Sequence, residues 1–243
     1  MDTVYNTNQF KKDLQEFHIT LTDKQMQQFL QYYELLTEWN RVMNLTGITE
    51  YDEVMKKHFV DSLSLVKACD LKGSFSLLDV GTGAGFPGLP LKIVFPDLKV
   101  TLLDSLNKRI QFLQAVIEKL GLNGIEALHG RAEDFAKPGL MREQFDFCVS
   151  RAVANMTILS EYCLPFVKVG GRFISYKSEK LEEESREAQK AIELLGGKEE
   201  AQVKLYLPDS DIFRNLFVIK KITHTPRGFP RKAGLPAKEP LRV

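Results

Sequence analysis

The feature that most constrains the fold is an alternation of short apolar runs and helical patterns from residue 74 onward. Five apolar runs of strand length occupy residues 75–80, 99–104, 125–129, 145–150 and 171–176. Helical patterns fall between them, as at 107–120 and 153–167. This alternation predicts an α/β protein whose parallel sheet is covered by helices on both faces.

The end of this region departs from the alternation. Two further strand patterns, 201–207 and 214–222, are separated only by residues 208–213. That connection is too short for a parallel crossover, so we predict an antiparallel hairpin at the edge of the sheet. The sheet would then be mostly parallel, with an antiparallel edge.

The first 70 residues are predicted to be helical. Thr22 and Gln25 form a capping box at a helix start. An apolar stripe at helical spacing follows at Met26, Phe29, Leu30, Tyr33 and Leu36, and shorter helices are expected at 51–57 and 58–68. We therefore divide the chain into an N-terminal helical cap (1–70), a core (71–223) and a C-terminal tail (224–243).

Charge and cysteine usage restrict the class of protein. Lys and Arg total 33 against 32 Asp and Glu, so a nucleic-acid partner would need a local basic patch. The cysteines, Cys69, Cys148 and Cys163, show no C-x-x-C spacing, which favours a reduced intracellular protein without a zinc site. No stretch approaches the ~20 apolar residues of a membrane span. We expect a cytoplasmic monomer with no membrane partner and no metal.

A glycine-rich loop follows the first predicted strand, with Gly81, Gly83 and Gly85 directly after Asp79-Val80. Glycines there allow close approach of a ligand and positive φ angles. With Gly88 the loop also matches the dinucleotide fingerprint, and Asp104 lies about 20 residues further on. The loop alone does not distinguish between NAD and S-adenosylmethionine as the cofactor.

Three observations favour S-adenosylmethionine. Pro87 lies in the turn that would offer N–H groups to a pyrophosphate, and proline has none. Asp79 is placed to hold the cationic amino-acid end of the cofactor, directly or through water. The predicted antiparallel hairpin is unlike the all-parallel sheet of simple dinucleotide folds.

Other positions are candidates for the remaining parts of the cofactor. Asp104 ends the second strand, where it could bind the ribose hydroxyls; Ala132 and Glu133 follow the third strand and suit the adenine ring; Phe86 could wall the pocket. Tyr176 and Lys180 match the Y-x-x-x-K pair of short-chain dehydrogenases. That pair needs a helix, and Tyr176 ends a strand pattern, so we discard it.

The segment after the fourth strand indicates the reaction. It carries Arg151 and lacks both the Asn/Asp-Pro-Pro-aromatic motif of amine methyltransferases and a Pro-Cys nucleophile; Cys148 should point into the sheet. A substrate atom that is already nucleophilic, such as guanine N7, meets this description. Catalysis would be alignment of that atom with the methyl group, so we name no general base.

Basic residues predict an RNA partner. Arg131, Arg151 and Lys177 follow successive strands at the carboxyl edge, where they could position the substrate. The proline-spaced tail, expected to be extended chain, adds Arg227, Arg231, Lys232, Lys238 and Arg242. The alternative for the tail is a disordered, solvated terminus. The acidic helical segment 181–200 should face away from RNA.

Several stretches resemble the GidB/RsmG methyltransferases of bacterial small-subunit ribosomal RNA. They are residues 40–46 (NRVMNLT), 58–63 (HFVDSL), 79–88 (DVGTGAGFPG), 150–152 (SRA) and 230–234 (PRKAG). The resemblance implies a Rossmann-like class I methyltransferase with an open, mostly parallel seven-stranded sheet, which modifies guanine N7 in the 530 loop of 16S rRNA. It also carries over Gly81, Phe86, Ala132, Glu133 and Arg151 as contacts to S-adenosylmethionine. Ser178 departs from the glycine of some relatives. For the segments around Asn44 and His58 we predict only the packing of a helical cap over the cofactor edge.

Alternatives stay open at this point. The same cofactor could serve another RNA, a protein or a small molecule as substrate, and an NAD-linked oxidoreductase or an RNA-binding module with a degenerate site are further hypotheses. The RNA substrate could be naked 16S rRNA, an assembly intermediate or the finished small subunit.

Overall fold

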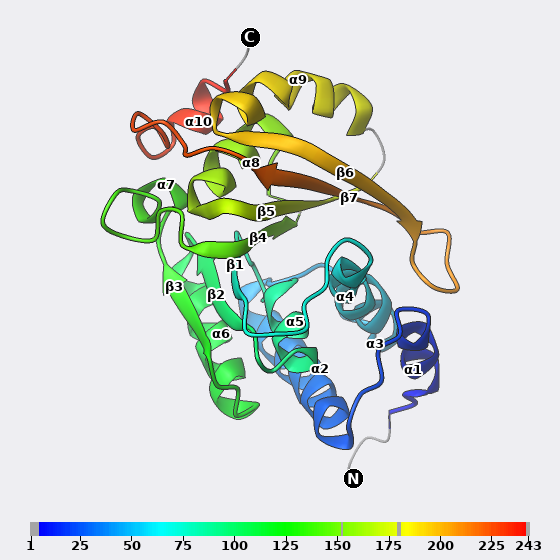
Figure 1. The fold of residues 1–243 in the computed structure, drawn as a ribbon. Coiled ribbons are helices and arrows are strands. Elements are labelled where there is room, and N and C mark those ends of the chain that lie inside the picture. Colours follow the sequence, from blue (N-terminus) through cyan, green and yellow to red (C-terminus); the bar gives the residue numbers. More distant parts are fainter. Residues whose placement is uncertain (1–4, 152, 179–180, 242–243) are drawn as a thin grey trace.

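The protein is built around one open sheet of seven strands in the order β3-β2-β1-β4-β5-β7-β6 (Figure 1). The computed structural model describes residues 5–151, 153–178 and 181–241. The strands are β1 Ser76–Val80, β2 Lys99–Asp104, β3 Ile125–His129, β4 Phe145–Arg151, β5 Val167–Lys177, β6 Gly197–Tyr206 and β7 Phe213–Lys221. This is the mostly parallel α/β sheet that the sequence predicts.

The predicted hairpin lies at the edge of the sheet. β7 pairs antiparallel with both β5 and β6, whereas all pairs among β1 to β5 are parallel. β5 begins at Val167, inside the helix expected over 153–167, and that helix is limited to α8 Met156–Cys163 with a 3₁₀ turn Leu164–Phe166. Pro165 in this turn cannot continue an α-helix, which explains the early end.

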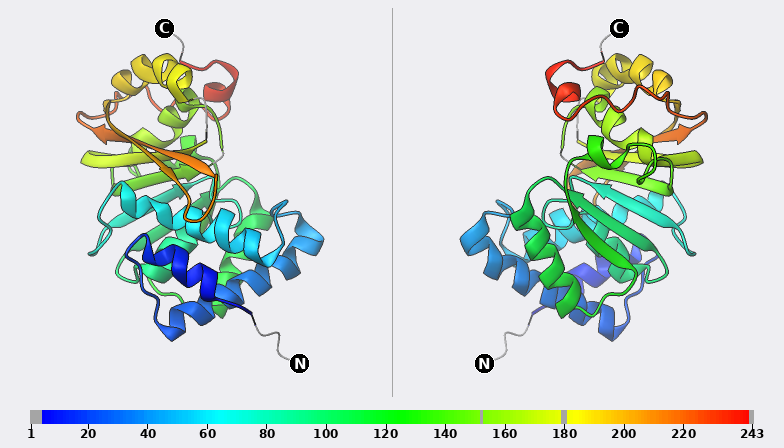
Figure 2. Two further views of the ribbon diagram at one scale, coloured as in Figure 1. Left: turned by 90° about the vertical axis from the view of Figure 1, so that its right-hand side faces the viewer. Right: turned by 90° about the vertical axis from the view of Figure 1, so that its left-hand side faces the viewer.

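Helices cover both faces of the sheet (Figure 2). One face carries α1 Asn8–Gln15, α2 Asp23–Met43, α3 Tyr51–Val54, α4 Asp61–Leu63, α5 Gly88–Val94 and α6 Asn107–Lys119. The other carries α7 Ala132–Phe135, α8, α9 Leu181–Leu194 and α10 Leu235–Lys238. Each face has its own hydrophobic cluster, and the N-terminal helices share theirs with β1, β2, α5 and α6.

The capping box predicted for Thr22 and Gln25 is present. The N-terminal helices differ from the sequence prediction in two other respects. The buried face of α2 includes Tyr32, which is fully buried, while Leu30 and Tyr33 are only partly buried. Helical spacing fits either tyrosine. Tyr32 is the buried one because its ring packs against Phe59, Phe86 and Phe112. The helices expected at 51–57 and 58–68 are one continuous run, in which a π-helical segment, Met55–Val60, joins α3 to α4.

The C-terminal tail packs on the sheet's second face, near α8, and is not wholly extended. It contains the short helix α10, whose Pro236 lies in the first turn, where a missing N–H costs no hydrogen bond. Arg242, which we counted in the basic tail, and Lys180 lie outside the described residues. No helix in the described ranges is long and apolar enough to cross a membrane.

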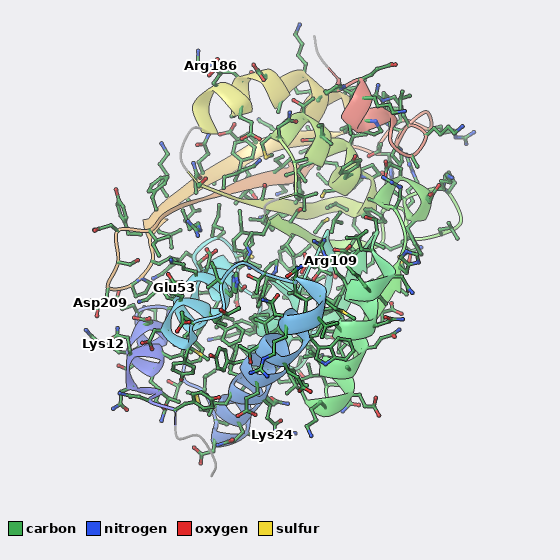
Figure 3. All side chains as sticks on the ribbon, turned by 180° about the vertical axis from the view of Figure 1, so that it is seen from behind. Lys12, Lys24, Glu53, Arg109, Arg186 and Asp209 are labelled. Carbon is green, nitrogen blue, oxygen red and sulfur yellow. The ribbon has the colours of Figure 1, made fainter. Side chains whose placement is uncertain are left out.

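The start of the described chain contacts the turn of the edge hairpin. Lys12 of α1 and Asp209, between β6 and β7, form an exposed ion pair of 2.5 Å, and their side chains lie together in Figure 3. Such exposed pairs contribute little to stability. A more buried pair between Lys56 Nζ and Asp13 Oδ2, also 2.5 Å, joins α1 to the π-helical segment.

Candidate functional site

The glycine loop between β1 and α5 is shaped by backbone that only glycine adopts easily. Gly81, Gly83 and Gly85 have φ angles of 71°, 63° and 99°. A Cβ on Gly85 would lie 2.6 Å from the Tyr32 hydroxyl, which donates a hydrogen bond to the carbonyl of Ala84. A Cβ on Gly83 would meet nothing within 4 Å. The loop is therefore held by Tyr32 of α2 on one side and has free space next to Gly83 on the other.

Asp79 supports the loop from inside the protein. Its fully buried Oδ2 accepts hydrogen bonds from the Thr82 hydroxyl (2.7 Å) and the Gly88 amide (2.9 Å). Its Oδ1 has no hydrogen-bond partner among the described residues. Burial raises the pKa of Asp79 to about 6. The direct contact to a cofactor that we expected of Asp79 thus stays a prediction, because the carboxylate does not line the pockets described below.

Asp104, at the end of β2, joins three parts of the site. Its buried carboxylate accepts hydrogen bonds from the amides of Gly83 and Leu106, both at 2.9 Å. The Arg109 guanidinium, at the start of α6 (Figure 3), donates to it at 3.1 Å. We did not single out Arg109 from the sequence, because its partner is set by how α6 meets the sheet.

Three adjoining pockets follow the carboxyl edge of the parallel strands. The narrow pocket, about 90 Å³, lies at the ends of β2 and β3, and the central pocket, about 380 Å³, lies over the glycine loop. Both are lined by Gly81, Asp104 and Val153. The wide pocket, about 530 Å³, continues toward β5 and shares His58 and Arg151 with the central pocket.

The narrow pocket contains the residues predicted for adenine. Ala132 and Glu133 are buried in its wall, so Glu133 is not the exposed helix-start acid that was the alternative. The Glu133 carboxylate accepts a hydrogen bond from the amide of Gly234 (2.8 Å), in the tail. Arg131 also lines this pocket, exposed, and is therefore apart from Arg151 and Lys177, which line the wide pocket.

An aromatic stack forms the wall of the central pocket. The Phe86 ring lies between Tyr32 and His58, with ring centroids 5.5 and 4.5 Å away, and the Arg151 guanidinium lies 5.0 Å from its centroid. His58 Nε2 is 2.8 Å from the Thr46 hydroxyl. Burial, assisted by the Arg151 charge, lowers the pKa of His58 to about 3. His58 is therefore neutral near pH 7.

Arg151 is fixed by a buried carboxylate. Its Nη1 is 2.9 Å from Oδ2 of Asp61, and Oδ1 of Asp61 accepts from Arg214 Nε at 2.8 Å. Asp61 is only 2% exposed. Removing either arginine would leave a less compensated buried charge, so this cluster holds Arg151 at the junction of the two larger pockets. The segment 58–63, for which we predicted only a packing role, thus supplies both His58 and Asp61.

The tail is anchored by an arginine that we had assigned to RNA. Arg231 donates through Nε (2.9 Å) and Nη2 (2.6 Å) to the carboxylate of Glu161 in α8, which is 1% exposed. Its backbone amide adds a third bond of 2.8 Å to the same group. Arg231 is therefore engaged within the protein, while Arg227, Lys232 and Lys238 are exposed.

Two further features concern groups that could react or bind metal. Cys148 is completely buried in the core of the sheet, as we expected. Among the residues that the structure describes, no three His, Cys, Asp or Glu side chains gather in a way that could hold a metal ion.

The sequence matches the GidB family model, described as rRNA small subunit methyltransferase G, over residues 25–212. The chain belongs to this family. It is 56% identical over 232 residues, 96% of both chains, to ribosomal RNA small subunit methyltransferase G of Lachnoclostridium phytofermentans. It is 48% identical over 235 residues to the protein of that name from Clostridium botulinum, covering 97% of this chain and 98% of that one. The resemblance seen in the motifs is confirmed.

Solved structures share the fold at lower sequence identity. A SAM-dependent methyltransferase from Aquifex aeolicus superposes with a TM-score of 0.52 at 21% identity, over 70% of this chain and 93% of that one. M. jannaschii TYW2, solved in complex with AdoMet, gives 0.51 at 14% identity, over 62% and 71% of the two chains. These likenesses confirm the Rossmann-like methyltransferase fold.

Proposed function

We propose that this protein transfers the methyl group of S-adenosylmethionine to N7 of a guanine in the 530 loop of 16S rRNA. The observation that carries the proposal is the row of three pockets, in which Arg151 and His58 line both the central and the wide pocket. Family membership supports rRNA as the substrate class. The guanine, its N7 and the loop come from the family resemblance and from the chemistry of the site.

The residues present fit S-adenosylmethionine. Gly83 leaves open space above the loop, and the unpartnered, buried Oδ1 of Asp79 lies beneath the same loop. We assign Ala132 and Glu133 to the adenine, Asp104 to the ribose, and the loop with Phe86 and Arg151 to the methionine end. When bound, the cofactor supplies an electrophilic methyl group on a sulfonium.

The same loop is poorly suited to a dinucleotide. A pyrophosphate needs free N–H groups at the helix start. Here Pro87 has none, the Gly88 amide is bonded to Asp79, and the Leu89 amide is bonded to the carbonyl of Gly85 at 2.8 Å. This arrangement favours the sulfonium cofactor over NAD.

The chain's own residues would act by positioning. Guanine N7 has a free lone pair and carries no proton, so transfer requires no general base. His58, with a pKa of about 3, presents a neutral ring that does not repel a sulfonium. Arg151, held by Asp61, is placed at the pocket junction to donate to an acceptor on the guanine.

The test is methylation of 16S rRNA and of small subunits with labelled S-adenosylmethionine, followed by nucleoside analysis and mapping of 7-methylguanosine. We expect one modified guanine, in the 530 loop. Arg151→Lys, which retains the charge, should lose most transfer, and Arg186→Ala, an exposed change on α9 (Figure 3), should have no effect. Modification of another atom or another RNA would refute the assignment.

A further inference from the structure

An ion pair on the wall of the wide pocket presents a donor and an acceptor side by side. Lys177, at the end of β5, places its Nζ 2.6 Å from Oε1 of Glu184 in α9. Both side chains line the pocket and are less than a quarter exposed, at 14% and 24%. Glu184 lies in the acidic segment that we expected to face away from RNA.

Each member of the pair is held in place by the segment after β4. Lys177 Nζ also donates to the carbonyl of Ala154 at 2.9 Å, and the amide of Met156 donates to Oε1 of Glu184 at 2.5 Å. The same segment contains Val153, which lines the narrow and central pockets. The pair is thus fixed relative to the cofactor site.

These bonds use only part of the hydrogen-bonding capacity of the two side chains, both of which line the wide pocket. Two of the three Lys177 donors are used, and so is Oε1 of Glu184. In the described part of the chain, Oε2 of Glu184 accepts no hydrogen bond. Among the described residues, one N–H of the Lys177 ammonium and the Oε2 oxygen of Glu184 therefore have no hydrogen-bond partner.

This pairing of a donor with an acceptor is complementary to guanine and opposed to adenine. Guanine presents an acceptor, O6, beside donors at N1 and N2, whereas adenine presents a donor, the 6-amino group, beside an acceptor at N1. On the basis of the proposed function, we propose that Lys177 binds O6 and Glu184 binds N1–H and the 2-amino group of the target base. The pair would be the specificity-determining element of the wide pocket.

The order of groups around the base agrees with the order of residues around the pocket. O6 is the neighbour of N7 on the purine ring, followed by N1 and N2. With N7 at the junction lined by His58 and Arg151, the remaining edge extends into the wide pocket, where Lys177 and Glu184 lie. Enzymes that act on a base extruded from its stack read it through this edge.

The test compares guanosine with inosine, which lacks the 2-amino group, at the target position of reconstituted small subunits. The wild-type protein should methylate guanosine at least about tenfold faster than inosine. This is the factor expected from one hydrogen bond between the 2-amino group and a charged acceptor. In Glu184→Gln the amide oxygen can still accept from Met156, but an NH₂ group replaces Oε2 and opposes the N1–H donor. Its rate on guanosine should fall at least about tenfold and its guanosine-to-inosine ratio should approach one.

Two controls separate this role from a structural one. Glu187→Gln, an exposed change on the same helix, should keep the wild-type ratio. The affinity for S-adenosylhomocysteine, measured by calorimetry, should be unchanged in Glu184→Gln. If that variant fails to fold, Glu184→Asp, which withdraws the carboxylate by one methylene, should lower the ratio in the same direction.

The outcomes distinguish this assignment from the proposed function. Methylation of guanosine by Glu184→Gln with the wild-type ratio would overturn the assignment and leave the function intact. Failure of the wild-type protein to methylate guanosine, both in naked 16S rRNA and in small subunits, would overturn the proposed function, and the assignment with it.

Discussion

The buried carboxylate of Asp79 should make the protein less stable as the pH rises, and Asp79→Asn should remove this effect. The change preserves an acceptor for Thr82 and Gly88 and puts a neutral NH₂ group where Oδ1 has no partner. It isolates the cost of holding a negative charge beneath the glycine loop.

The magnitude follows from the pKa of this group. Burial raises the pKa of Asp79 from 3.8 to about 6, a difference of about two units. A raised pKa means that the folded protein keeps its proton when the unfolded chain has lost it. Stability is therefore fully present below about pH 4 and is lost as the pH rises to about 6, by about 3 kcal/mol.

Urea unfolding of both proteins from pH 4 to 8 measures the difference. We expect the free energy of unfolding of Asp79→Asn, relative to wild type, to increase by about 3 kcal/mol up to pH 6 and to stay constant above it. The variant should also bind S-adenosylmethionine more weakly, because it lacks the negative charge that we expect to hold the cationic amino-acid end of the cofactor. Parallel pH profiles for the two proteins would show that the Asp79 carboxylate carries no such cost.

Two predictions concern the tail. Arg231→Ala leaves the carboxylate of Glu161 buried without its partner, so we expect a loss of about 3 kcal/mol in unfolding experiments, whereas a wild-type midpoint would show that the pair is dispensable. Replacing the exposed residues Arg227, Lys232 and Lys238 together by Gln should leave stability unchanged and lower the salt slope of RNA binding by about 2, and an unchanged slope would remove the tail from the RNA interface.

The elements of the sheet could be predicted because they depend on local patterns. Buried parallel strands are continuous apolar runs, and the short link between β6 and β7 permits only a hairpin. The ends of β5 and α8 were missed because a proline and the pairing with β4 decide them together.

The candidate site was predictable where the glycine loop and strand ends define it. Gly81, Phe86, Asp104 and Arg151 all line the central pocket. Its supports could not be predicted, since they join residues far apart in the chain.

Examples of such supports are the hydrogen bond from Gly234 to Glu133 and the contact of Arg151 with Asp61. The tail shows the same limit. Its charge and prolines suggested an extended RNA-binding segment, but the buried partner of Arg231 belongs to α8 and is invisible in the local sequence.

A crystal structure of the protein with S-adenosylmethionine bound would show directly whether the pockets hold the cofactor as proposed. We expect adenine in the narrow pocket at Ala132 and Glu133, ribose on Asp104, and the methyl group facing the wide pocket between His58 and Arg151. A methyl group directed away from that junction, or a cofactor bound outside these pockets, would contradict the proposal.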